Sequence, residues 1–171
     1  MAYETILLET NDAAVAVLTL NRPESHNALN LQMVEEIHDV LGRFETSDEA
    51  KALVVTAAGG KAFMSGADIA ELRERRRPDA WKGINTTLFS RLESFPHPTV
   101  AAIEGWCMGG GCELVTACDF RVAGATSRFG QPEVRDEEWP HVLEPPLRER
   151  EREGRGRQDV ARVTQSRRQV E

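Results

Sequence analysis

Three consecutive glycines, Gly109–Gly111, lie between a short apolar segment and an apolar stretch with helical character. Glycine lets the backbone approach a ligand closely, and the N–H groups that open a helix have no partner within it. Such donors, aimed at one point, can bind an anion or a developing oxyanion. The same glycines also suit a tight turn with close helix packing. A phosphate-binding P-loop is excluded because no Gly-Lys-Ser/Thr follows.

A second loop, from Ser65 to Asp68, also lies between an apolar strand pattern and a predicted helix start. Asp68 suits the N-cap of that helix, which is a purely structural role. The order strand, glycine loop, helix occurs twice, in residues 51–77 and 99–118, although the residues themselves are not repeated. The backbone N–H groups of the two loops are therefore a candidate donor pair.

Two glutamates could supply acid–base chemistry beside such donors. Glu113 lies three residues after Gly110, among apolar neighbours in a helix predicted to enter the core. A buried carboxylate is costly unless it is paired, so Glu113 is either a functional group or a structural partner of Arg121 or Arg128. Glu133 is either a second carboxylate or a solvated loop residue. Two carboxylates near a polarised carbonyl can add water across an activated double bond, one deprotonating water and one protonating carbon.

The other residue types that hold metals or act as nucleophiles are dispersed. The four histidines and three cysteines show no ligand spacing, so we expect no metal site. No histidine lies near a cysteine to activate it, and we expect the cysteines to be small core residues. These residues are His26, His38, His97 and His141, together with Cys107, Cys112 and Cys118.

The elements that must position these groups alternate between strands and helices, which predicts an α/β fold. Apolar residues in 31–44 recur every three or four positions and predict an amphipathic helix. Asn11 and Asp12 predict a hairpin turn, and 60–68 and 106–111 are predicted loops. The predicted strands are 5–10, 14–20, 51–57 and 99–105, with short ones in 119–124 and 127–133, and the predicted helices are 31–44, 68–77, 81–95 and 112–117.

The chain has 171 residues, of which 40% are hydrophobic and 29% are charged, with a formal net charge of −7. That length and apolar content predict one domain with a packed core. No apolar run approaches the roughly 20 residues of a membrane-spanning helix, and we expect neither a membrane partner nor a secretory leader. The acidic balance argues against nucleic acid as a partner. Three cysteines without CxxC spacing favour a reducing, cytoplasmic location.

A change in composition predicts a boundary between Val134 and Arg135. Residues 1–134 carry 12 basic and 19 acidic side chains, whereas residues 135–171 carry nine of each and almost no periodic apolar positions. We expect a core in 1–134 and a divergent charged tail in 135–171 that is disordered or irregular. The arginines of residues 148–168 leave a nucleic-acid role open, although no aromatic residues alternate with them for base stacking.

Four segments carry a family resemblance: NRPESHNALN, KALVVTAAGGKAFMSGADIAEL, PTVAAIEGWCMGGGCELVTACDFRVA and FGQPEV. In this order they resemble the enoyl-CoA hydratase/isomerase (crotonase) family, and several separate motifs in register make the match specific. The resemblance covers roughly residues 5–134. It implies a crotonase-like spiral of repeated ββα units that binds acyl-CoA thioesters.

By this resemblance, the backbone N–H groups of Ala67 and Gly110 form an oxyanion hole that stabilises the enolate at the thioester carbonyl. Glu113 and Glu133 match the two glutamates of the hydratases, with Glu113 holding and deprotonating the water and Glu133 protonating the α-carbon. Coenzyme A is part of the substrate, and no other cofactor is expected. The implied substrate-binding residues are His26, Ala28, Ser65, Ala67, Asp68, Ile69, Gly109 and Gly110.

Within the family, the resemblance favours a hydratase that converts a trans-2-enoyl-CoA to a 3-hydroxyacyl-CoA. The double-bond isomerases generally need only the carboxylate matching Glu133, so isomerase activity is the alternative that Glu113 disfavours. Family members continue after FGQPEV with a glycine-rich stretch and with helices that complete the acyl pocket and the homotrimer or hexamer. Residues 135–171 do not match these, as a frameshift or truncation would explain. An inactive fragment that only binds coenzyme A is the further alternative.

Overall fold

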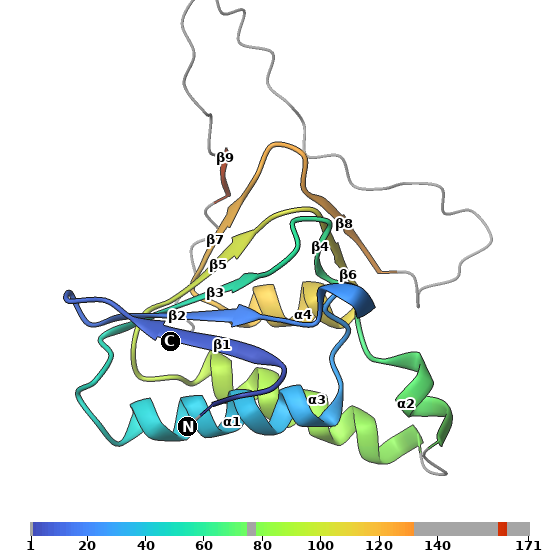
Figure 1. Cartoon of the computed structure of the whole chain (residues 1–171), viewed down its shortest axis with the longest axis horizontal. Helices are drawn as coiled ribbons and strands as arrows, with labels where there is room; N and C mark the ends of the chain where they lie inside the picture. The colour runs from blue at the N-terminus through green and yellow to red at the C-terminus, as the bar shows by residue number, and fades with distance from the viewer. Residues whose placement is uncertain (1, 75–77, 132–160, 164–171) are drawn as a thin grey trace, which may run out of the picture.

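The computed structural model describes residues 2–74, 78–131 and 161–163, whose strands form two sheets (Figure 1). Figure 1 shows the long helices α1 and α3 side by side beneath the larger sheet, and α4 contacts α3 and the smaller sheet. The helices are α1 (Leu31–Glu45), α2 (Ile69–Glu74), α3 (Pro78–Glu93) and α4 (Gly110–Ala117), and a 3-10 turn, η1, covers Pro23–Ser25.

The larger sheet has the strand order β1-β2-β3-β5-β7-β9. The first pair is the predicted antiparallel hairpin, the next three pairs are parallel, and β9 pairs antiparallel with β7. The sequence does not predict β9, a three-residue strand within the charged tail that pairs with the edge of β7. The strands are β1 (Ile6–Thr10), β2 (Val15–Leu20), β3 (Ala52–Ala57), β5 (Thr99–Ile103), β7 (Phe120–Ala123) and β9 (Ala161–Val163).

A smaller parallel sheet has the order β4-β6-β8, formed by β4 (Ala62–Met64), β6 (Trp106–Met108) and β8 (Arg128–Gly130). The sequence predicts loops over β4 and β6, and this prediction is wrong. A three-residue strand is too short to show an alternating pattern, and these strands exist because each pairs with its neighbours. Each of β3, β5 and β7 is followed by a strand of the smaller sheet, so the chain repeats a unit of two strands. Helices follow the first two of these units.

Two predicted helix starts move by two residues or more. Helix α3 begins at Pro78 rather than at residue 81, because proline fits the first position of a helix, where its missing N–H leaves no bond unmade. Helix α4 begins at Gly110, two residues before the predicted start, so the third glycine of the loop is already helical.

The core lies between the larger sheet and the helices. The amphipathic pattern of α1 is confirmed, because the helix buries six apolar side chains at the predicted spacing. The largest completely buried side chains are Ile6, Leu18, Leu20, Leu29, Met33, Leu41, Phe44, Leu53, Phe63, Met64 and Leu88.

A buried carboxylate ties the start of β1 to α1. Glu36 is only 6% exposed and accepts hydrogen bonds from the backbone N–H groups of Glu4 and Thr5, at 2.8 and 2.9 Å, and from the Thr5 hydroxyl at 2.6 Å. The side chain of Gln32 donates a further bond at 3.0 Å. Burial favours the neutral carboxyl, but these donors outweigh it and hold the pKa of Glu36 below its ordinary value.

We expect Glu36→Gln to lower the free energy of unfolding at pH 7 by about 1–3 kcal/mol, because an amide cannot accept all of these bonds. A carboxyl group whose pKa is lowered by folding stabilises the fold fully at pH values above its ordinary pKa. This stabilisation is lost as the pH falls through the folded-state pKa. Urea melts at several pH values should therefore show the difference from wild type shrinking below about pH 4. The exposed neighbour variant Glu35→Gln is the control, and an equal effect there would contradict the assignment.

Candidate active site

The two glycine-containing loops predicted to supply backbone donors lie against each other. Strands β4 and β6 are parallel neighbours, so the loops that follow them leave the same edge of the smaller sheet. A Cβ atom built on Gly110 would lie 3.8 Å from the Cα of Gly66 and 4.0 Å from the backbone N of Ala67. A Cβ atom on Gly66 would lie 3.7 Å from the backbone N of Gly110. The structure thus brings the Ala67 and Gly110 amides together.

Both amides are left available by the bonds around them. Residues Leu29 and Ala67 form a parallel bridge in which the Leu29 N–H donates to Gly66 at 2.8 Å and the Asp68 N–H donates to Leu29 at 3.0 Å. The Ala67 N–H takes no part in this bridge. Gly110 opens α4, where an N–H has no intrahelical acceptor. Within the described ranges, neither amide donates a hydrogen bond to the protein.

Glycine is needed in these loops for backbone conformation and for space. Gly66 and Gly109 have φ values of 102° and 50°, in the region that side chains disfavour. At Gly111 a Cβ atom would lie 2.7 Å from the carbonyl oxygen of Met64, so only glycine allows α4 to approach β4 this closely. The close helix packing that the sequence offered as the structural alternative is therefore present here.

The predicted coenzyme A segment around His26 and Ala28 lies beside the first of these loops. The backbone N–H of Ser65 donates to the carbonyl of His26 at 3.1 Å. Asn27, only 1% exposed, holds the segment in place, because its side-chain amide donates to the carbonyls of Ala58 and Ala62, at 3.0 and 2.8 Å. The two predicted segments therefore lie side by side, with the Ala28 side chain buried and His26 exposed.

Asp68 has the structural role that the sequence offered as an alternative. Its carboxylate accepts hydrogen bonds from the N–H groups of Ala70 and Glu71, at 3.1 and 3.4 Å, and so caps α2. It also pairs with Arg22 at 3.0 Å, and the same guanidinium donates to the carbonyl of Ala28 at 2.7 Å. Burial of Asp68 favours the neutral form, but the bond from Arg22 and those from the backbone hold its pKa below the ordinary value. The next residue, Ile69, is 64% exposed.

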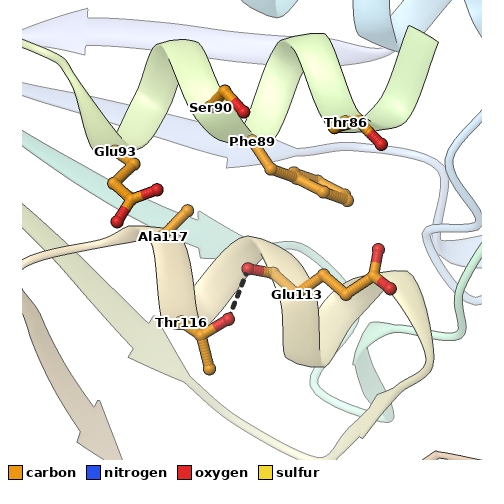
Figure 2. Close-up of a pocket in the computed structure, with 7 residues that line it drawn as sticks. All are labelled: Thr86, Phe89, Ser90, Glu93, Glu113, Thr116 and Ala117. Carbon is orange, nitrogen blue, oxygen red and sulfur yellow. Dashed lines mark hydrogen bonds between the residues drawn. The ribbon is translucent and has the colours of Figure 1, made fainter. Parts of the chain in front are cut away.

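Glu113 lines a cleft of about 420 Å³ between α3 and α4. Figure 2 shows its side chain and the Phe89 ring reaching toward the same end of the cleft, whereas Glu93 lies beside Ala117 at the other end. The ring of Phe89 would lie 3.9 Å from a Cβ atom on Gly110, which places Glu113 and the donor loop on one cleft wall. Helix α4 thus carries both an amide donor and a carboxylate.

The expectation that Glu113 is buried is wrong. Helix α4 buries Gly111, Leu114, Val115 and Ala117, and its remaining face, which carries Glu113, is exposed. The two arginines proposed as structural partners are engaged elsewhere, since Arg121 donates to the carbonyls of Val115 and Cys118, at 2.9 and 2.7 Å. Arg128 lies over the Trp106 ring, 5.6 Å from its centroid.

The second predicted carboxylate, Glu133, lies outside the described residues. Among those that are described, no group of three or more His, Cys, Asp or Glu side chains is placed to hold a metal. The helices of the described part include none long and apolar enough to cross a membrane. Cys107 and Cys118 are buried in the core, as expected, and burial raises the pKa of Cys118 to about 12.

Comparison with known proteins decides the family. The family model described as enoyl-CoA hydratase/isomerase matches residues 10–136, which is most of the chain. The chain belongs to this family. The fold agrees, because the enoyl-CoA hydratase structure from Bacillus anthracis superposes with a TM-score of 0.72 at 32% identity, covering 76% of this chain and 51% of that one. The predicted crotonase-like α/β fold is confirmed.

Relatives within this family include two proteins named as hydratases. The short-chain-enoyl-CoA hydratase of Clostridium acetobutylicum is 43% identical over 136 residues, and the crotonyl-CoA hydratase of Syntrophomonas wolfei is 40% identical over 136 residues. Each match covers 78% of this chain and 52% of the relative. The chain therefore spans about half the length of the relatives it matches.

Sequence reasoning missed two residues that support this family site, Arg22 and Asn27. Both lie in NRPESHNALN, which the sequence presents as polar loop. Asn27 has a φ of 54° and accepts from the Arg22 N–H at 2.8 Å, besides its two bonds to carbonyls. An asparagine in a polar loop is a known signal for left-handed backbone, but its distant partners leave no local trace in the sequence.

We expect Gly111→Ala to lower the free energy of unfolding by about 1–3 kcal/mol, because the new methyl group would collide with backbone at Met64. Gly83→Ala is the matched control within α3, where a Cβ atom meets nothing within 4 Å. That variant should be more stable by about 0.5–1 kcal/mol, since alanine favours helix. Thermal and urea unfolding compare the two variants. Equal effects would show that α4 does not pack on β4 as described.

Proposed function

We propose that this chain is an enoyl-CoA hydratase, which adds water to a trans-2-enoyl-CoA thioester to give a 3-hydroxyacyl-CoA. The observation that carries the proposal is the meeting of the available Ala67 and Gly110 amides beside the Glu113 carboxylate. The hydratase names of the relatives support the same reaction class. Acyl-CoA metabolism, including fatty-acid β-oxidation, uses this step. The three cysteine thiols favour a reducing, cytoplasmic setting.

In this proposal, the two amides act on the thioester carbonyl oxygen. Attack of water at the β-carbon moves electrons onto that oxygen and forms an enolate, so donors fixed beforehand stabilise the transition state more than the substrate. Removing one such donor typically costs about 2.7–4 kcal/mol in the reaction barrier. Because the Leu29–Ala67 bridge and the close packing at Gly111 hold the two loops, the Ala67 and Gly110 amides need little reorganisation during the reaction.

The carboxylates complete the proton transfers. Glu113 holds the water and takes its proton as the C–O bond forms, and Glu133 delivers a proton to the α-carbon. In this proposal the two groups share one water. Isomerase activity is the alternative within the family. The exposed position of Glu113 on the cleft wall beside the donors supports hydration over that alternative.

Binding of coenzyme A falls to the two loops that lie together. His26 and Ala28 on one side and Ser65 to Ile69 on the other form the contact surface, with Gly109 and Gly110 next to the thioester. Coenzyme A enters as part of the substrate, and the proposal includes no metal or redox cofactor. It requires neither nucleic acid nor a membrane, and a trimer or hexamer of the family type would depend on contacts beyond the described core.

We expect Glu113→Gln to lower the hydration rate of a short trans-2-enoyl-CoA by about 10²–10⁴-fold, since an amide cannot take the proton from water. The assay follows the loss of enoyl-thioester absorbance. Glu93→Gln is the matched control, because it removes a carboxylate from the other end of the same cleft. It should retain the wild-type rate. Equal losses in both variants would contradict the role of Glu113.

Assays of turnover and of coenzyme A binding by the wild-type chain distinguish a working enzyme from a fragment that only binds coenzyme A. Turnover by the folded chain supports the hydratase. Saturable binding of coenzyme A without turnover would overturn the activity and leave the family assignment unchanged.

A further inference from the structure

Two of the three cysteines flank the Gly109–Gly111 loop and contact each other. Cys107 lies in β6 and is completely buried, and Cys112 lies in the first turn of α4 and is half-buried. The Cys112 thiol donates to the carbonyl oxygen of Cys107 at 3.0 Å and lies 3.4 Å from the carbonyl oxygen of Gly130. The Cys112 thiol is thus bonded to the backbone of the residue that carries the other thiol. They are therefore neighbours in space as well as in sequence.

The third cysteine lies apart from this pair. Cys118 follows the other end of α4, and its sulfur lies 3.6 Å from the carbonyl oxygen of Leu114. By contrast, the Cys107 sulfur would lie only 3.4 Å from a Cβ atom on Gly111, the residue next to Cys112. The chain thus contains one close thiol pair and one separate buried thiol, which serves as an internal control.

We propose that Cys107 and Cys112 form a dithiol site that a hydroperoxide oxidises to a disulfide. The Cys112 sulfur attacks the peroxide, so that an S–O bond forms, the O–O bond breaks and water or an alcohol leaves. The Cys107 sulfur then attacks the sulfenic sulfur, so that the S–S bond forms and the S–O bond breaks. The departing hydroxide takes the Cys107 proton and leaves as water. Two thiols are oxidised and one peroxide is reduced.

The environments of the two thiols assign these roles. Cys112 is the attacking group because its side chain is only half-buried and a peroxide can reach it, whereas Cys107 is completely buried. The hydrogen bond with Cys112 and burial raise the pKa of Cys107, so this residue stays protonated until a sulfenic acid forms beside it. A buried thiol of this kind can resolve the intermediate, whereas it would be inert alone.

The disulfide would join β6 to α4 across the loop that carries Gly110. It would thereby fix the position of that amide and remove the bond from the Cys112 thiol to the Cys107 carbonyl. An effect on the hydration rate would follow from this, and that effect rests on the proposed function. Formation of the disulfide does not rest on the proposed function, so counting thiols tests the disulfide independently of activity.

The experiment treats the folded, reduced full chain with hydrogen peroxide, removes the peroxide and counts thiols in denaturant by alkylation and intact mass. The chain has three cysteines, and the count should fall from three to one, with a mass loss of about 2 Da that dithiothreitol reverses. Three remaining thiols would overturn the proposal. So would a mass gain of about 16 or 32 Da at Cys112 without a disulfide.

Two variants locate the bond. Cys118→Ser leaves the pair intact, and its thiol count should fall from two to zero. Cys112→Ser removes the attacking group, and both of its remaining thiols should survive treatment. Loss of both thiols in Cys112→Ser, or their survival in Cys118→Ser, would contradict the pairing of Cys107 with Cys112.

Discussion

At Gly111 the backbone of α4 lies so close to β4 that a Cβ atom there would come within 2.7 Å of the Met64 carbonyl oxygen. This close approach makes the two loops meet, because α4 begins at one loop and β4 leads into the other. Because β4 and β6 are paired in parallel, the loops that follow them leave the same edge of the smaller sheet. The Ala67 and Gly110 amides therefore converge as a consequence of packing, and glycine at 66, 109 and 111 is what permits it.

Polar contacts then fix the surroundings of the amide pair. Arg22 links Asp68 to the Ala28 carbonyl, and Asn27 ties the same segment to carbonyls on either side of the β3–β4 turn. These polar groups bond within the protein and hold the loops, and none of their bonds uses the Ala67 or Gly110 N–H. The carboxylate of Glu113 remains on the exposed face of α4, next to the cleft. The residues that hold the loops are thus different from the residues proposed to act on the substrate.

Much of this could be predicted from the sequence, since its signals are local. The spacing in 31–44 predicts α1, and the two glycine loops after apolar strands predict two loops of one kind, which the structure places together. The strands β4 and β6 could not be predicted, because three residues carry no period and pairing alone creates them. The apolar neighbours of Glu113 misled the burial prediction, because adjacent helix positions face different sides. Asn27 bonds to residues 31 and 35 positions away, which no local pattern records.

If the Ala67 and Gly110 amides bind a thioester carbonyl oxygen, the infrared spectrum of a bound acyl-CoA should show it. With butyryl-CoA carrying ¹³C at the thioester carbonyl, we expect a carbonyl stretch at lower frequency than in water when the chain is saturated. Gly110→Pro should abolish most of that shift, because proline fits the first helical position but lacks the N–H. An unshifted carbonyl stretching frequency with the wild-type chain, or an equal shift with Gly110→Pro, would show that these amides do not bind the carbonyl oxygen.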